Sequence, residues 1–202
     1  MAHVALIGAS GQAGSRILKE LAERGHRVTA LARHPEHIAQ LPGVTAAAVD
    51  IHDQAALSAA LKGHEVVISS VHFTASNPEV LLAAVRASGA ARYLVVGGAG
   101  SLLAGGKRLI DSPDFPALYL AEATAGTAYL ERLRSQQGLD WTFLSPSAMF
   151  VPGARTGQFR LGGDDLLVGP EGSQISFEDY AVALVDEIEQ PKHRGQRFTV
   201  GY

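Results

Sequence analysis

The sequence predicts an α/β fold, a doubly wound parallel sheet in a single domain spanning residues 1–202. Short apolar runs alternate along the chain with longer stretches of helical spacing, which is the pattern of consecutive βαβ units. The runs are apolar on both faces, as expected for parallel strands that helices cover on two sides. With 202 residues, 47% of them hydrophobic, the chain is long enough for one substantial core and short enough for one domain.

Apolar runs along the chain mark the expected strands, and we expect six or seven of them. In chain order the runs are VALIG, RVTALA, VTAAAVD, EVVISS, YLVVGG, WTFLS and RFTVGY. Helical spacing follows the first run in RILKEL, and further helices are expected over residues 117–137 and in FEDYAVALVDEIE. Glycine and proline cluster over residues 97–116 and 146–172, after the fifth and sixth strands. Open α/β sheets build their ligand sites from such segments, at the carboxyl ends of strands.

Composition and charge argue against several classes of partner. The formal net charge is −3, and the 17 lysines and arginines are scattered, so we expect no nucleic-acid binding. Without cysteine the chain has no disulfide framework or thiolate chemistry, which suits a reducing compartment. The first residues show no signal-peptide pattern, and no apolar run reaches membrane-spanning length. We therefore expect a cytoplasmic protein with no membrane partner, and a homodimer is compatible with the sequence.

A glycine-rich turn, GASGQAG, directly follows the first expected strand and opens a helix. Gly8 allows the tight turn, Gly11 lets the backbone approach a pyrophosphate, and Gly14 permits close packing of helix on strand. The amino terminus of the helix adds free N–H groups and the positive end of its dipole. The alternative is a purely structural turn, but the strand–turn–helix context favours dinucleotide binding.

The ends of the next three strands supply further cofactor candidates. Arg33 follows the second strand, where NAD-specific proteins place Asp or Glu, and a guanidinium there matches the 2′-phosphate of NADP. We therefore expect NADP, with NAD as the alternative if Arg33 is only a solvated loop cation. Asp50 either accepts from the adenine amino group or caps the helix that begins near Asp53. Ser69 and Ser70 end the fourth strand, where the chain passes the ribose and pyrophosphate.

The chain lacks the Tyr-x-x-x-Lys pair that serves carbonyl reductases, because none of its five tyrosines has lysine four residues later. Such a pair protonates the alkoxide formed by hydride addition, since a nearby cation lowers the pKa of the tyrosine. A flavin accepts hydride on a ring nitrogen and spreads the negative charge over its conjugated rings. Positioning can then carry most of the catalysis, and glycines at the end of the fifth strand leave room for a flat ring.

Several motifs together resemble one known family. GASGQAG follows the first strand, Arg33 the second, and VVGGAGSL the fifth; the carboxyl-terminal part contains DWTFLSPSAMFVPGARTGQFRLGGDDLL, ISFEDYAVALVDEIE and RFTVGY. These motifs are similar to those of atypical short-chain dehydrogenases of the NADH-flavin reductase type, which are relatives of the flavin reductase and biliverdin reductase B group and of NmrA-like proteins. The resemblance covers essentially the whole chain, and PGARTGQFRLG is its most specific part.

The resemblance implies a Rossmann fold, a nicotinamide cofactor, and flavin as a substrate instead of a bound prosthetic group. Two segments match the family by position. The cofactor side comprises Gly8, Ser10, Gly11, Gln12, Ala13, Gly14, Arg33, Asp50, Ser69, Ser70, Gly97 and Gly98. Pro146 and Ser147 match the segment that passes the nicotinamide.

Catalytic residues are harder to assign than cofactor residues. Ser101 lies nearest the usual place of a catalytic serine, and His72 follows the fourth strand, where it could donate a proton; the alternatives are a turn cap and an ordinary loop histidine. Tyr119, Phe150 and Arg155 lie on the two long segments expected to line the substrate pocket. The rings could stack on a flavin or pack in the core, and Arg155 could meet an anionic tail; Tyr119 is also a catalytic candidate.

Two questions remain, whether the chain binds a metal and which function it has. His34 and His37 have a metal-like spacing but no third ligand, so we expect no metal site. The leading functional hypothesis is an NADPH-dependent reductase of a flavin or a similar conjugated acceptor. The alternative is an NmrA-like sensor that binds NADP and reports redox state without turnover, because the missing Tyr and Lys fit both.

Overall fold

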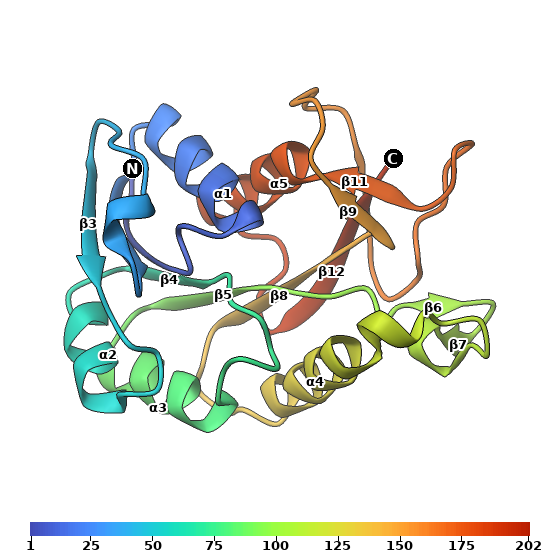
Figure 1. The fold of residues 1–202 in the computed structure, drawn as a ribbon, viewed down its shortest axis with the longest axis horizontal. Coiled ribbons are helices and arrows are strands. Elements are labelled where there is room, and N and C mark those ends of the chain that lie inside the picture. Colours follow the sequence, from blue (N-terminus) through green and yellow to red (C-terminus); the bar gives the residue numbers. More distant parts are fainter.

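The computed structural model describes residues 1–202 and contains an eight-stranded sheet with helices on both faces (Figure 1). The strand order is β3-β2-β1-β4-β5-β8-β12-β10, and all neighbours are parallel except β10, which runs antiparallel to β12. The fold is therefore the doubly wound α/β fold expected from the sequence. The strands of the sheet are β1 (His3–Ile7), β2 (Arg27–Ala32), β3 (Val44–Ala48), β4 (Val66–Ser69), β5 (Arg92–Val96), β8 (Trp141–Pro146), β10 (Arg160–Gly162) and β12 (Gln196–Gly201).

Helices cover the two faces of the sheet in two groups. Helices α1 (Gln12–Glu23) and α5 (Phe177–Glu189) lie side by side on one face. Helices α2 (Gln54–Leu61), α3 (Pro78–Ser88) and α4 (Ala117–Arg134) cover the other face (Figure 1). No helix is both long enough and apolar enough to cross a membrane.

Side-chain alternation along the strands produces one core on each face of the sheet. In β1, Val4 and Leu6 belong to the cluster shared with α1 and α5, whereas Ala5 and Ile7 belong to the cluster shared with α2, α3 and α4. All four side chains are fully buried. A parallel strand needs apolar residues on both faces for this reason, and the same property made the runs visible in the sequence.

Polar side chains mark the beginnings of three helices. Asp53 accepts a hydrogen bond from the Ala56 amide at the start of α2, and Asn77 and Ser176 cap α3 and α5 in the same way. Asp50 is therefore not the cap of α2: it is exposed, and its Oδ1 accepts from the His52 amide in the preceding turn. The alternative that made Asp50 a helix cap is wrong, because Asp53 takes the cap position and the helix begins at Gln54.

The expected six or seven strands are all present, but the sequence prediction missed several short ones. Besides β10, two small two-stranded sheets pair residues within or next to the segments predicted as irregular. Runs of two or three residues show no periodicity, so only tertiary pairing defines them. The missed elements are β6 (Leu103–Ala104), β7 (Lys107–Arg108), β9 (Met149–Val151), β11 (Gln174–Ser176) and the 3₁₀ turns η1 (Pro35–His37) and η2 (Leu109–Asp111).

The topology places the ends of five strands around one crevice. From β1 the chain moves outward through β2 to β3, and it then returns to the other side of β1 with β4 and continues outward. The reversal lies between β1 and β4, and open α/β sheets bind ligands at the carboxyl ends of strands at such a reversal.

The end of β5 carries two adjacent glycines that differ in their surroundings. A Cβ at Gly97 would lie 2.3 Å from Phe143 Cε1 and 2.7 Å from the Leu144 carbonyl oxygen, whereas a Cβ at Gly98 would meet nothing within 4 Å. We predict that Gly97→Ala lowers the free energy of unfolding by about 1–3 kcal/mol through overpacking and that Gly98→Ala leaves it nearly unchanged. Urea unfolding of both variants checks this, and equal midpoints would contradict it.

Candidate functional site

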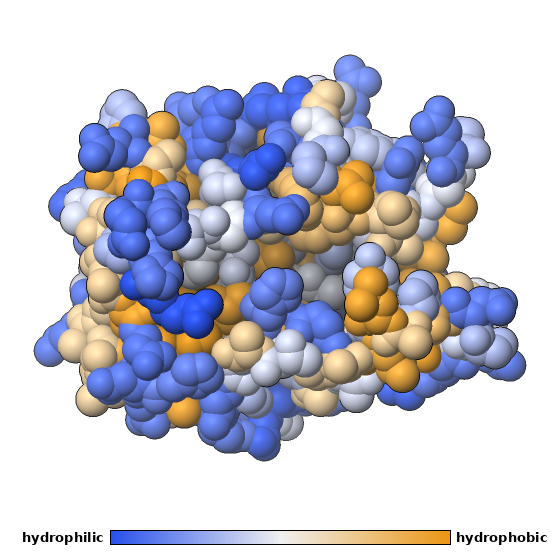
Figure 2. Space-filling view, in the orientation of Figure 1, coloured by the Kyte–Doolittle hydropathy of each residue, from blue (hydrophilic) through white to orange (hydrophobic).

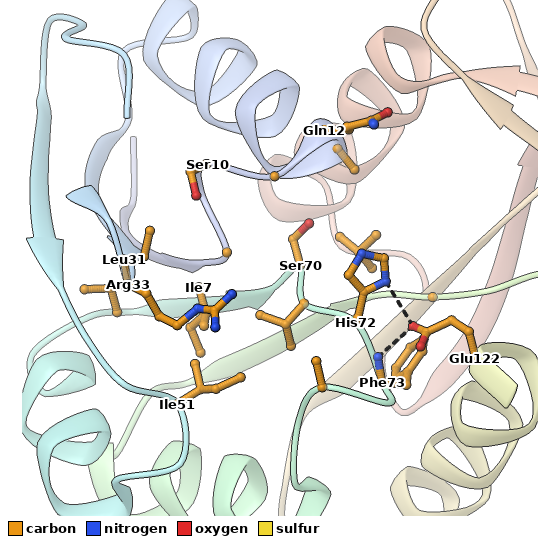
Figure 3. Close-up of a pocket in the computed structure, with 18 of the residues that line it drawn as sticks. Ile7, Ser10, Gln12, Leu31, Arg33, Ile51, Ser70, His72, Phe73 and Glu122 are labelled. Carbon is orange, nitrogen blue, oxygen red and sulfur yellow. Dashed lines mark hydrogen bonds and ion pairs between the residues drawn. The ribbon is translucent and has the colours of Figure 1, made fainter. Parts of the chain in front are cut away.

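A cavity of about 740 Å³ lies at the carboxyl ends of the five strands β1, β2, β3, β4 and β5. Its volume is in the range of sites that bind small molecules and cofactors. It extends from Arg33 and Ile51 at one end to His72 and Glu122 at the other, with the glycine turn between them (Figure 3). Of its 23 lining residues, 13 are hydrophobic, so most of its wall is apolar.

Close packing at the glycine turn confirms the structural roles predicted for two of its glycines. Gly8 has φ +82°, and a Cβ there would lie 2.1 Å from the Ser70 carbonyl oxygen. A Cβ at Gly14 would lie 2.1 Å from the Gly8 carbonyl oxygen, so this glycine lets α1 pack directly on the turn. The two contacts bring the start of α1 to the cavity, and side chains at either position would push it away.

The amino terminus of α1 has the features of an anion site. Its N-cap is Gly11, which has no side chain to accept a hydrogen bond, and its first turn contains no acidic residue. The amides of a first helical turn have no partners within the helix and lie at the positive end of the dipole. Ser10, Gln12 and Ala13 line the cavity here, together with Gly8 and Gly11.

Arg33 extends into the other end of the cavity, above Ile51 (Figure 3). Its guanidinium forms no ion pair, whereas Arg16, Arg24 and Arg155 are each paired with a carboxylate. Leu31, Val49 and Ile51 add an apolar wall, and His52 completes it. A cation beside an apolar wall suits an anionic group attached to an aromatic ring.

The loop after β4 is held against α4 by Glu122. This carboxylate accepts hydrogen bonds from the Phe73 amide (2.7 Å), the Thr74 amide (3.0 Å) and the Thr74 hydroxyl (2.6 Å). His72 Nδ1 lies 3.5 Å from Glu122 Oε1 (Figure 3). Partial burial opposes ionisation of Glu122, but the hydrogen bonds from Thr74 and Phe73 outweigh it and keep the pKa of the carboxyl below its usual value.

Aromatic side chains form the wall beyond Gly97. Phe150 from β9 packs edge-on against Phe177 at the start of α5, with ring centroids 4.5 Å apart, and both rings line the cavity. Tyr119 lines it from α4 and is 59% exposed, so it is free to contact a ligand. We call this wall, formed by Tyr119, Phe150 and Phe177, the aromatic rim. Figure 2 shows apolar surface beside it, at the start of α4 and at β9. The exposed apolar residues there are Leu118, Tyr119 and Leu120 on α4 and Met149 and Val151 on β9.

Several site residues expected from the sequence lie outside the lining of the cavity. Ser101 is buried, and its hydroxyl faces the Arg197 guanidinium at 3.4 Å. Ser147 is fully buried and donates to the Val200 carbonyl, and Ser69 is buried within β4. The expected residues that do not line the cavity are Gly14, Asp50, Ser69, Gly98, Ser101, Pro146, Ser147 and Arg155.

Arg155 was expected to line the cavity, but its guanidinium forms an ion pair with Glu20 of α1 instead. Its Nε and Nη2 donate to the two carboxylate oxygens of Glu20, each at 2.7 Å. Burial opposes ionisation of Glu20, but the hydrogen bonds from Arg155 and Arg24 outweigh it and lower the pKa of its carboxyl. The next two amides, of Thr156 and Gly157, donate to Asp179. The specific PGARTGQ run therefore fastens a loop to α1 and α5.

The lining residues that sequence reasoning missed include His52, Phe73, Glu122 and Phe177. One signal for Glu122 was present, because it precedes Gly126 by four residues and shares its helix face. A Cβ at Gly126 would lie 2.9 Å from the Phe73 ring, so this glycine makes room for the ring. The acidic residue and the glycine at this spacing therefore lie on the face of α4 against which the loop docks.

A glycine turn under a free helix amino terminus, at the strand-order reversal of a parallel sheet, defines a dinucleotide-binding Rossmann domain. Comparison with known families agrees. The model of the NAD(P)H-binding family matches residues 8–191, and the chain belongs to that family.

Three solved structures resemble this chain over its whole length. A Burkholderia pseudomallei protein, provisionally described as exported, is 44% identical with a TM-score of 0.90 and full coverage of both chains. A Bacteroides thetaiotaomicron protein, provisionally described as an epimerase, is 40% identical with a TM-score of 0.94 and 97% coverage of its chain. A Streptococcus pneumoniae protein, provisionally described as an NADH-flavin reductase, is 34% identical with a TM-score of 0.86 and 99% coverage.

The Arg155–Glu20 pair gives a prediction that separates a structural role from a substrate role. Arg155→Ala should lower the free energy of unfolding by up to about 1 kcal/mol, because solvent screens a pair in which half of the arginine side chain is exposed. Cofactor and acceptor affinities should not change. Arg108→Ala, which removes an exposed pair with Asp111, is the control and should have a smaller effect. Weaker acceptor binding with unchanged stability would instead assign Arg155 to the substrate.

Proposed function

We propose that the protein is a cytoplasmic, NADPH-preferring reductase that transfers hydride to a flavin or a similar conjugated acceptor. One observation carries the proposal: a single cavity has an unpaired arginine at one end, an aromatic, apolar rim at the other, and an anion site between them. The absence of cysteine supports the cytoplasmic location, whereas the description of the Burkholderia pseudomallei relative as exported favours another.

The cofactor fits the residues that line the cavity. The first-turn amides of α1 would hold the pyrophosphate, and the close backbone contacts at Gly8 and Gly14 place those amides at the cavity. Arg33 would hold the 2′-phosphate, and Val49 and Ile51 would pack on the adenine. When bound, the nicotinamide supplies a hydride.

The acceptor end lacks the acid of a carbonyl reductase. Tyr93, Tyr129 and Tyr180 are buried in the cores, and burial raises the pKa of their hydroxyls. Tyr119 is the tyrosine that lines the cavity, and no lysine does. An acceptor that disperses negative charge over conjugated rings is therefore favoured, and Tyr119 and Phe150 are placed to contact its faces.

The relatives support parts of this proposal. The description of the Streptococcus pneumoniae protein as an NADH-flavin reductase supports a flavin acceptor. That description names NADH, so the preference for NADPH rests on Arg33 alone. The epimerase description of the Bacteroides thetaiotaomicron protein differs, and the acceptor therefore rests mainly on the aromatic rim.

A turnover assay tests the reductase against an NmrA-like sensor, which the missing Tyr and Lys would also allow. NADPH oxidation is followed by the loss of the absorbance of the reduced nicotinamide, with FMN, FAD or a quinone as the acceptor. We expect steady oxidation with at least one of them. Tight NADPH binding without turnover on any acceptor would support the sensor.

Cofactor preference tests the assignment of Arg33. Arg33→Ala should weaken NADPH binding about ten- to a hundredfold, because it removes a charge-assisted contact worth roughly 1.5–3 kcal/mol. NADH binding should hardly change. Arg33→Asp should go further and favour NADH, because its carboxylate repels the phosphate and accepts from a ribose hydroxyl. Calorimetric titration of wild type and both variants with each cofactor gives the dissociation constants, and an equal loss for both cofactors would make Arg33 an ordinary surface cation.

A further inference from the structure

We propose that His72 donates a proton to the reduced acceptor and that Glu122 is the positioning residue that holds His72 at the cavity. The inference rests on the proposed function and adds the source of the proton. His72 follows β4 in the chain and lies at the acceptor end of the cavity, beside Glu122 of α4 (Figure 3). The two residues come from segments about fifty positions apart.

The reaction consumes one proton for each hydride. Hydride transfer brings the acceptor one hydrogen nucleus and two electrons, which leaves a net negative charge on the reduced acceptor. A proton from the His72 imidazolium then gives the neutral, doubly hydrogenated product, and the imidazole becomes neutral. Solvent returns the proton, because 83% of the His72 side chain is exposed.

The other polar groups of the cavity are poorly suited to this role. Arg33 does not release a proton near neutral pH, and His52 lies at the opposite end of the cavity, next to Ile51. Glu122 is ionised and already accepts three hydrogen bonds. No arginine or lysine lines the cavity beside Tyr119, because Arg33 lies at the opposite end. An imidazole titrates near neutral pH and can deliver a proton there, which leaves His72.

Two contacts on one face of α4 hold the loop that carries His72. Glu122 binds the amides of the two residues after His72, and one turn later Gly126 receives the Phe73 ring. The loop backbone is thus fixed immediately next to the imidazole. Glu122 is the carboxylate in ion-pair range of His72, at Nδ1, which leaves Nε2 to face the cavity.

The test compares single and double variants with NADPH and either FMN or 1,4-naphthoquinone. His72→Gln should lower kcat by about a hundredfold, the low end for general acid catalysis, and remove the alkaline limb of the pH profile. Glu122→Gln should lower kcat less and move that limb to lower pH, because the imidazolium loses its counter-charge. The double variant should match His72→Gln alone, since Glu122 acts through His72.

Two readouts do not depend on turnover. NADPH dissociation constants should stay unchanged in His72→Gln and Glu122→Gln, since neither residue lies at the cofactor end. Amide hydrogen exchange at Phe73 and Thr74 should accelerate in Glu122→Ala, which removes both acceptor oxygens. His37→Gln and Glu131→Gln are matched controls, because both residues are exposed and lie outside the cavity.

The outcomes separate this inference from the proposed function. A His72→Gln variant with the wild-type rate and pH profile overturns the proton donor and leaves the reductase standing. Additive losses in the double variant overturn the positioning role of Glu122 and make it a structural residue. If the wild-type protein oxidises NADPH with neither acceptor, the proposed function and the proton donor both fall.

Discussion

The closest backbone approach in the site lies at the first turn, where the chain between β1 and α1 passes directly over the end of β4. Gly8 lies against the Ser70 carbonyl and Gly14 against the Gly8 carbonyl, with no room for a side chain at either position. Because of these contacts, the start of α1, the end of β4 and the loop toward His72 meet at one place. The cavity, its anion site and its histidine all depend on that approach.

Charged contacts hold the outer loops around this centre. Glu20 binds Arg155 of the loop after β9, and Glu178 of α5 pairs with Arg16 of α1 and accepts from the Gly153 amide. These contacts tie α1 to α5 and to the segment that carries Phe150. The aromatic rim is therefore fixed relative to the helix that begins at the glycine turn.

The features that depend on local sequence could be predicted, and those that depend on distant packing could not. The strand runs, the glycine turn and the bounds of α5 follow from patterns within about fifteen residues, and Arg33 is placed by its position after β2. The partner of Arg155 is 135 residues away in the chain, and nothing near PGARTGQ indicates it. Glu122 bonds residues 48 and 49 positions earlier. Asp50 and Asp53 are three residues apart, and the sequence pattern does not show that Asp53 caps the helix and Asp50 lies in the turn before it.

The cavity draws its two ends from different parts of the chain. Residues 7–52 supply the wall from the glycine turn to Ile51, whereas α4, β9 and the start of α5 supply the aromatic rim. Under the proposed function, residues 7–52 would hold the cofactor and the rim would contact the acceptor, so the rim is the part to vary when a changed substrate range is sought.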